Sequence, residues 1–155
     1  MRWLIGGRSL ATAATSNHCG AQLWNPSTTN ACWVAAISLA QTAATISNVS
    51  IKRSTARGAT PTATVTPTIA SDMDRAIIPP TVAVLELATF TTQPTLEGVP
   101  LWSWNNPAAI GSGFVIPFET KDLHGIKIPP GTGLCVYTPV AVILQPFDIT
   151  LFMFE

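Results

Sequence analysis

Hydrophobic and polar residues alternate with a period of two along several stretches of this chain, which is the pattern of β-strands. In residues 47–53, "SNVSIKR", Val49 and Ile51 share one face and polar side chains occupy the other. Residues 62–67, "TATVTP", alternate in the same way. Such alternation predicts antiparallel strands with one face in the core and one face toward water.

Later strands are predicted to be apolar on both faces. Residues 81–90, "TVAVLELATF", contain one charge, Glu86, and residues 134–144, "LCVYTPVAVIL", contain none. Strands of this kind are covered on both sides. In a small β-protein, we expect the second cover to be another subunit.

The C-terminal segment, residues 147–155, "FDITLFMFE", has the same character. Four apolar side chains are expected to fill one buried layer, namely Phe147, Ile149, Leu151 and Met153. Phe152 and Phe154 lie on the opposite face with two polar residues. We expect these two rings to contact either the other side of the core or a neighbouring subunit.

One segment fits both a helix and a strand. Residues 31–45, "ACWVAAISLAQTAAT", are rich in alanine, which favours a helix, whereas Trp33, Val34 and Ile37 favour a strand. No N-terminal capping box and no C-terminal glycine frames a helix here. We therefore predict a strand.

The thirteen prolines are spread along the chain, and no long segment has the period of an amphipathic helix. Roughly eight to ten short strands with turn residues between them are typical of a sandwich or barrel. We predict an all-β, antiparallel, jelly-roll-like sandwich as a single domain over residues 1–155. Residues 1–20 are expected to form an extended N-terminal arm or the first strand.

Residues 126–139, "IKIPPGTGLCVYTP", crowd prolines and glycines against an apolar run. A phosphate-binding loop needs a lysine and a following helix, whereas a strand pattern follows here. Pro129 and Pro130 impose an extended backbone, and Gly131 and Gly133 permit turn conformations that other residues resist. We predict a structural corner that leads into a buried strand, with Gly131 in a conformation disfavoured for residues with a Cβ.

Charge is scarce and balanced. The 155 residues include 8 Lys and Arg and 8 Asp and Glu, so the net charge is zero and the charged fraction is 10%, where about 25% is usual. This balance gives no reason to expect nucleic acid as a partner. No stretch reaches the roughly 18 apolar residues of a membrane-spanning helix. Because a monomer with so few charges would expose apolar patches, we predict a homo-oligomer, with a trimer favoured.

The first sixteen residues, "MRWLIGGRSLATAATS", imitate a signal peptide. Their apolar part is only residues 3–5, and two glycines and Arg8 follow it. We predict that this segment belongs to the mature protein.

Few residues suggest chemistry. Cys19, Cys32 and Cys135 make an odd count without a C-x-x-C pair, which predicts reduced, packed thiols. His18 and His124 are the only histidines, and His18 with Cys19 and Cys32 lacks the tight paired spacing of zinc sites. We predict no metal at these residues.

Asp72 and Asp74 form the only close carboxylate pair. Their spacing leaves three alternatives: a turn in which Arg75 pairs with an acid, a calcium site, or acid–base catalysis. We favour the turn, because a calcium loop needs more oxygen ligands. No G-x-S-x-G motif supports a catalytic serine, so we predict no catalytic residue, no metal site and no cofactor.

The best binding candidate is the segment "PLWSWNNPAAIGSG", residues 100–113. Trp102 and Trp104 lie two residues apart, so on a strand they project from one face. Asn105 and Asn106 are expected to follow at a turn. Aromatic rings with amides can grip a sugar, and tryptophan also anchors subunit interfaces. The sequence leaves two alternatives for Trp102 and Trp104: they contact a ligand such as a glycan, or they pack in the core or in a subunit interface.

Along most of its length, the chain resembles small jelly-roll subunits of tailed-bacteriophage virions. The shared features are the length, the low charge, the Thr-, Ala- and Pro-rich strands and the closing segments "GIKIPPGTGLCVYTP" and "FDITLFMFE". The chain resembles, more loosely, trimeric jelly rolls of the tumour-necrosis-factor type. No single motif carries the likeness, so it transfers no functional residues.

The resemblance implies a non-enzymatic capsid decoration, or cement, protein on the virion, assembled in the host cytoplasm. Its partners would be major capsid or tail proteins. The alternative is a tail-attached adhesin that binds a receptor or a carbohydrate.

Overall fold

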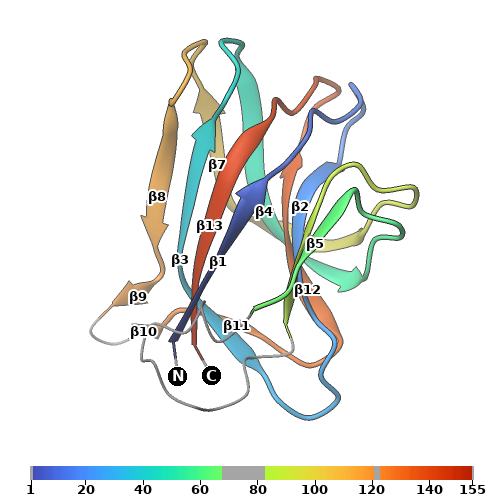
Figure 1. Cartoon of the computed structure of the whole chain (residues 1–155), viewed down its shortest axis with the longest axis vertical. Coiled ribbons are helices and arrows are strands. Elements are labelled where there is room, and N and C mark those ends of the chain that lie inside the picture. The colour runs from blue at the N-terminus through green and yellow to red at the C-terminus, as the bar shows by residue number, and fades with distance from the viewer. Residues whose placement is uncertain (1, 68–82, 121–122, 155) are drawn as a thin grey trace.

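Two antiparallel β-sheets pack against each other in the computed structural model, which describes residues 2–67, 83–120 and 123–154 (Figure 1). The described residues form strands, turns and loops, without a helix. The all-β sandwich predicted from the sequence is confirmed. Asp72, Asp74 and Arg75 lie outside the described residues, so the alternatives for that segment are not taken further.

Sheet A consists of five strands: β1 (Arg2–Arg8), β13 (Phe147–Phe154), β3 (Cys32–Gln41), β8 (Gly113–Pro117) and β11 (Ile126–Ile128). β13 lies between β1 and β3, and both β8 and β11 pair with the far edge of β3. β8 and β11 therefore act as one edge strand. A small hairpin of β9 (Glu119–Thr120) and β10 (Leu123–His124) interrupts it.

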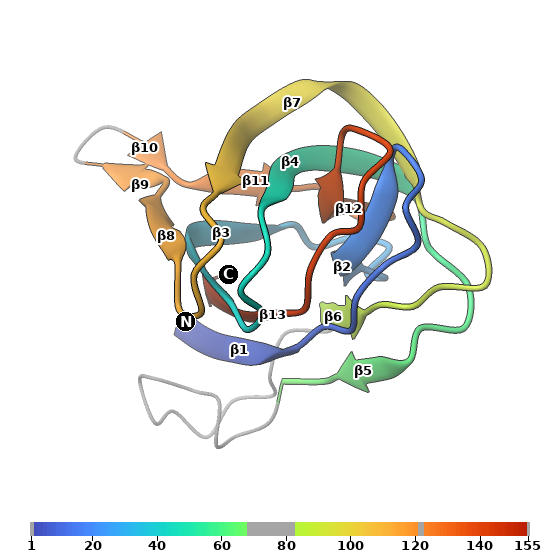
Figure 2. The same cartoon turned by 90° about the horizontal axis from the view of Figure 1, so that it is seen from above.

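Sheet B consists of six strands, in this order across the sheet: β5 (Ala63–Val65), β6 (Val84–Leu87), β2 (His18–Asn25), β12 (Thr132–Thr138), β4 (Ser47–Ala56) and β7 (Thr95–Asn106). All neighbouring strands pair antiparallel. β7 is an edge strand and curves around the outside of β4 (Figure 2).

The topology is easiest to compare with known folds when β5 and β6 are left out and β8 and β11 are counted as one strand. Eight strands then remain, with the chain order 1-8-3-6 in sheet A and 2-7-4-5 in sheet B. This is the strand order of a jelly roll, as the sequence predicted. Residues 2–8 form its first strand instead of an extended arm.

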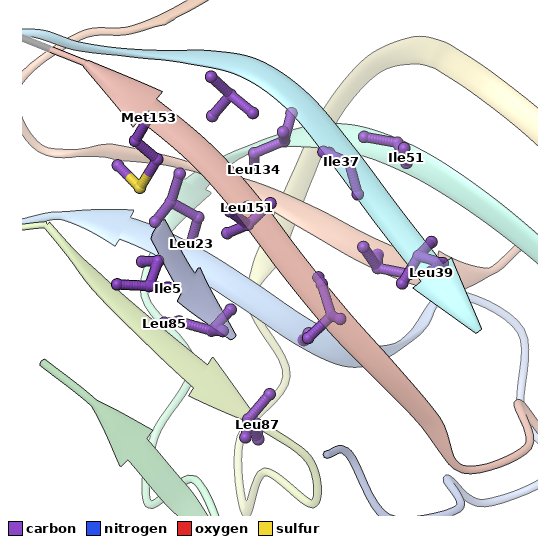
Figure 3. Close-up of a cluster of buried hydrophobic side chains, with 14 of the residues drawn as sticks. Ile5, Leu23, Ile37, Leu39, Ile51, Leu85, Leu87, Leu134, Leu151 and Met153 are labelled. Carbon is purple, nitrogen blue, oxygen red and sulfur yellow. The ribbon is translucent and has the colours of Figure 1, made fainter. Parts of the chain in front are cut away.

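The core between the sheets is built by the inward faces of these strands (Figure 3). β13 alternates strictly between buried and half-buried residues. The predicted layer of Phe147, Ile149, Leu151 and Met153 is confirmed, since all four are buried in the core cluster. Phe152 and Phe154 point away from it and are half-buried on the outer face of sheet A.

The ambiguous segment, residues 31–45, forms β3 over residues 32–41, so the strand prediction is confirmed. Val34 and Ile37 are buried in the core. Thirteen strands occur in the described residues, more than the eight to ten expected, because β5, β9, β10 and β11 are only two or three residues long.

The corner predicted at the proline–glycine stretch is also present. It connects β11 of sheet A to β12 of sheet B. Gly131 has φ of +65°, the left-handed region that residues with a Cβ rarely adopt. The Gly131 N–H donates to the Asn25 carbonyl at 2.9 Å, and the Thr132 hydroxyl donates to the Pro129 carbonyl at 2.8 Å. Leu134 and Val136 then enter the core.

The prediction of one continuous strand over residues 134–144 was wrong. β12 ends at Thr138, and residues 139–146 form a loop. The physical reason is Pro139, which has no N–H to donate to a neighbouring strand. The Thr138 hydroxyl then bonds to the Val140 carbonyl at 3.0 Å, which turns the chain.

The jelly-roll topology gathers four loops at one end of the sandwich (Figure 1, top). They connect β1 to β2, β3 to β4, β7 to β8 and β12 to β13. We call them together the loop end: residues 9–17, 42–46, 107–112 and 139–146. The opposite end, which holds the turns at residues 26–31 and 129–131, is called the corner end.

Candidate functional site

The loop end is apolar and uncharged. None of its four loops contains Asp, Glu, Lys or Arg. Each nevertheless places aliphatic side chains in solvent, up to 72% exposed for Ile110 and 64% for Ile46. Half of the exposed large hydrophobic residues of the described chain lie here: Leu10, Ile46, Ile110, Val140, Val142 and Ile143.

Hydrogen bonds tie the loops of this end to one another. The Thr12 N–H donates to the Leu144 carbonyl at 3.0 Å, and the Leu144 N–H donates back to the Thr12 hydroxyl at 3.1 Å. Both the N–H and the hydroxyl of Thr42 donate to the Pro146 carbonyl, each at 2.9 Å. Residues 139–146 are thus bonded to two of the other three loops.

Gln41, the last residue of β3, connects the remaining loop. The Gly111 N–H donates to the Gln41 carbonyl at 2.8 Å, and the Gln41 N–H donates to the Ser112 carbonyl at 2.8 Å. The Gln41 side-chain Nε2 also donates to the carbonyls of Ala43 and Thr45. The four loops therefore form one bonded platform.

The predicted tryptophan pair lies on β7. Trp102 and Trp104 project from one face, as the period of two required, because their Cα partners on β4 are Ile51 and Val49 in the core. The two rings therefore lie on the core-facing side of sheet B, at its edge. They are 43% and 39% exposed, since β7 has no strand beyond it.

The two tryptophans differ in their surroundings. The ring of Trp104 meets that of Phe114 on β8 edge to face, with centroids 5.6 Å apart and an interplanar angle of 61°. Since β8 belongs to the other sheet, this contact closes part of the margin between the sheets. No such ring contact holds Trp102 within the parts of the chain that the structure describes.

The predicted asparagine turn was wrong in detail. Asn105 and Asn106 end β7, and the turn begins at Pro107. Asn106 is buried, and its Oδ1 accepts no hydrogen bond from the described residues. Asn105 is exposed. Of the two amides, only that of Asn105 can therefore reach a ligand from solvent.

A cavity of about 280 Å³ lies at the corner end, beside the base of β7. Arg53 on β4 and Glu97 on β7 are Cα partners, and Arg53 Nη1 donates to the Lys127 carbonyl at 2.7 Å. The sequence did not predict this site, because its residues are distant in the chain and come together only through the cross-strand register. The lining residues are Arg53, Ser54, Glu97, Lys127, Pro129 and Thr132.

The outer face of sheet A carries an aromatic row. Lys127, Trp33 and Phe154 lie opposite one another on β11, β3 and β13. The rings of Trp33 and Phe154 stack with centroids 5.8 Å apart, and the Lys127 ammonium sits 5.7 Å from the Trp33 centroid. Leu4 and Val115 are exposed on the same face. No further sheet of the described residues is stacked on this face.

An ion pair marks the other end of that face, next to the loop end. Arg8 Nε and Nη2 donate to the two oxygens of Asp148 at 2.7 and 2.9 Å. This hydrogen bonding holds the pKa of the Asp148 carboxyl below its usual value of 3.8. The two charges cancel each other at the rim of the loop end.

A second ion pair lies on the outer face of sheet B and has one buried and one half-exposed partner. Arg57 Nη2 lies 2.6 Å from Glu86 Oε1, and the Glu86 side chain is fully buried. Glu86 Oε2 accepts no hydrogen bond from the described residues. The neighbouring Gln22 side chain is buried too, and it bonds to Ser54 and to the Gly58 N–H. Glu86, which the sequence placed on a strand apolar on both faces, thus belongs to an internal polar network.

The cysteines and histidines form no joint site. Cys19, Cys32 and Cys135 are buried, in agreement with the prediction of packed thiols. Cys19 and Cys135 lie together outside sheet B, whereas Cys32 lies in the main core. Burial, with a hydrogen bond to Cys135, raises the pKa of the Cys19 thiol well above its usual value. His18 begins β2 and His124 ends β10. In the described ranges, no three His, Cys, Asp or Glu residues cluster as metal ligands.

Among the described residues, no helix has the length and apolar character needed to cross a membrane. Comparison of the chain with protein-family models, with curated proteins and with solved structures finds no match.

Proposed function

We propose that this chain is a non-enzymatic structural protein of a virion, an oligomeric decoration subunit that docks on a larger protein shell through its loop end. The observation that carries the proposal is the uncharged, aliphatic loop end. Solvent-facing ends of β-sandwiches ordinarily carry charges, and a contiguous apolar patch marks a surface that is covered in use. The jelly-roll fold, which recurs among capsid domains, supports the proposal by analogy.

The chemistry of the loop end favours a protein partner. Helices and loops that lie in a membrane surface combine apolar residues with Lys or Arg, and Trp or Tyr mark the interface. The loop end has none of these four residue types. Aliphatic side chains without charges instead suit the desolvated centre of a protein–protein interface.

The hydrogen bonds between the loops support the same proposal. Binding orders mobile loops at a cost in conformational entropy, and this cost falls when the loops are already fixed. The bonds of Thr12, Thr42 and Gln41 fix the platform before any partner arrives. Affinity can then come from apolar burial alone.

The outer face of sheet A supplies a second contact, between copies of the chain. Its stacked aromatic row and its exposed Leu4 and Val115 suit a self-complementary or cyclic interface. A homo-oligomer, with a trimer favoured, would cover this face while the loop end meets the shell. The adhesin alternative draws instead on Trp102 and Trp104, which lie on the edge strand β7 at the open margin between the sheets.

The docking test uses particles of the virus that encodes this chain, produced without it. Wild-type protein should co-sediment with them. A triple variant, Ile46→Ser, Ile110→Ser and Ile143→Ser, should lose about 100-fold or more in affinity because three aliphatic side chains no longer bury their surface. Val99→Ser, which alters an even more exposed aliphatic residue on β7, should bind like wild type.

Circular dichroism must show that the triple variant remains folded. Unchanged binding of that variant, or no co-sedimentation of wild type, would overturn the proposal. Native mass spectrometry tests the oligomer separately: a stable monomer at micromolar concentration would refute that part.

A further inference from the structure

The margin at the base of β7 combines an exposed ring with unsatisfied polar groups. Trp102 is the Cα partner of Ile51, and Glu97 is the partner of Arg53, two residues further along β4. Trp102 is therefore the first residue of β7 beyond Glu97 that pairs with β4, and its partner Ile51 is two residues from Arg53, which lines the cavity.

A local irregularity of β7 creates this arrangement. Between the pairs Ile51–Trp102 and Arg53–Glu97, β4 advances by two residues and β7 by five, so residues 98–101 bulge outward. Gly98 has φ of +74°, and a Cβ there would meet nothing within 4 Å. The bulge separates the edge of β7 from β4 and leaves room for the cavity.

The charges in the cavity are opposite and incompletely paired. Arg53 donates Nη1 to the Lys127 carbonyl, and its other guanidinium donors have no partner among the described residues. Glu97 forms no ion pair within 4.0 Å among the described residues, although Arg53 is its cross-strand partner. The Lys127 ammonium sits over Trp33 on the outer face of sheet A, so Lys127 lines the cavity without placing its charge there.

We infer that this cavity binds one neutral pyranose residue of a glycan, whose chain continues over Trp102 and Trp104. A carboxylate accepts hydrogen bonds from two vicinal hydroxyls, and a guanidinium donates to ring and hydroxyl oxygens. The exposed indole offers an apolar platform for the C–H face of the ring. The Thr132 hydroxyl, which already donates to the Pro129 carbonyl, keeps acceptor capacity at the rim.

The same groups disfavour other occupants. One guanidinium beside one carboxylate gives the cavity no net charge, so the cavity offers no net electrostatic attraction to an anion such as a phosphate or a sialic acid. A volume of about 280 Å³ suits a single sugar ring and lies near the lower limit of small-molecule sites. The cavity lies at the corner end, which the proposed docking leaves in solvent, so the inference does not depend on that docking.

The test begins with an array of immobilised neutral gluco-, galacto- and mannosides, with sialylated and sulfated glycans as a second arm. Neutral glycans should bind, and acidic ones should not. Titration calorimetry with the strongest neutral oligosaccharide then compares variants. Trp102→Ala and Glu97→Gln should each weaken binding about tenfold or more, through lost stacking and lost charged hydrogen bonds.

Leu101→Ala is the matched control. Leu101 is as exposed as Trp102, at 40%, and precedes it on the same strand. This variant should bind within about twofold of wild type, because Leu101 belongs to the bulge and has no Cα partner on β4, whereas Trp102 pairs with Ile51 on the core face. Absence of any neutral glycan binding, preference for acidic glycans, or equal effects of Leu101→Ala and Trp102→Ala would overturn the inference. So would a Trp102→Ala variant that changes the native oligomeric mass without changing glycan affinity, which would make this margin an interface between copies.

Discussion

The two ends of the sandwich rest on the same strands but differ in chemistry. The loop end has no charged residue and six exposed aliphatic side chains. The corner end has Arg53, Glu97 and Lys127 around a cavity. In a soluble chain, charges keep a surface wetted, so an end without them is the one that we expect a partner to cover.

The difference lies in the loops and not in the core. Both ends are anchored by the same inward-facing residues of β13 and β3. Apolar residues at the loop end cannot be explained by burial within one chain, since they remain exposed there. A jelly roll thus separates a shared core, which gives stability, from two sets of loops that can be used independently.

The largest effect is expected from a substitution in the core, which supports both ends of the sandwich. Leu151→Ala should lower the free energy of unfolding by about 2–5 kcal/mol, from lost apolar burial and the cavity left behind. Phe152→Ala, at the adjacent half-buried position, should cost less, about 1–2 kcal/mol, since part of the ring is already in water. Urea denaturation measures both variants.

The Phe152→Ala result also tests the outer face of sheet A. If Phe152→Ala costs as much as Leu151→Ala, and the loss depends on protein concentration, a second copy covers that face. A chain without residues 147–155 should not fold, because β13 lies between β1 and β3. A folded truncated chain would contradict the central place of β13.

The next prediction compares substitutions of one glycine at the loop end and one at the corner end. Gly111 at the loop end has φ of +79° and Gly131 at the corner end has φ of +65°, and a Cβ at either would meet no atom within 4 Å. Replacing either by valine should therefore cost about 1–3 kcal/mol through backbone strain alone. Thermal denaturation should give similar losses for the two variants. A much smaller loss for Gly111→Val would mean that the loop end is less rigid than the corner end.

A smaller effect tests the bonding between the loops. Thr12→Val removes the hydroxyl that accepts the Leu144 N–H and leaves that buried donor unpaired. We expect a loss of about 1–2 kcal/mol. Hydrogen exchange should show faster exchange at Leu144 and its neighbouring loops, with no change at the corner end. Uniform acceleration over the whole chain would show that the loops do not form a separate platform.

Much of the core could be predicted from the sequence, because local rules decide it. Alternation fixed the faces of β13 and β7, and Gly131 revealed the corner through its backbone freedom. The end of β12 was missed because the apolar run continues past Pro139 into residues that stay exposed. An apolar pattern alone does not distinguish a buried strand from an exposed apolar loop that could form an interface.

The functional surfaces depend on distant parts of the chain. The loop end gathers four segments that only the jelly-roll topology brings together. The pairing of Arg53 with Glu97 requires the bulge at residues 98–101. Gly98 and Pro100 mark this segment in the sequence, but they do not reveal the register shift. The tryptophan face was predictable from spacing, whereas the cavity next to it needed the register.

The smallest effect concerns the ion pair of Arg8 and Asp148 beside the loop end. The hydrogen bond from Arg8 lowers the pKa of Asp148 below 3.8 in the folded chain. A lowered pKa means that the ion pair stabilises the fold above the unfolded value and that this contribution is lost as pH falls through the folded value. Asp148→Asn should therefore be slightly less stable than wild type at about pH 6, and the two should converge as the pH falls through the lowered pKa of the folded state and the wild-type carboxyl becomes protonated. Both partners are largely exposed, so the difference should also shrink in high salt. A gap that persists at low pH would show that Asp148 acts through packing, and that charge does not define the boundary between the loop end and the rest of the molecule.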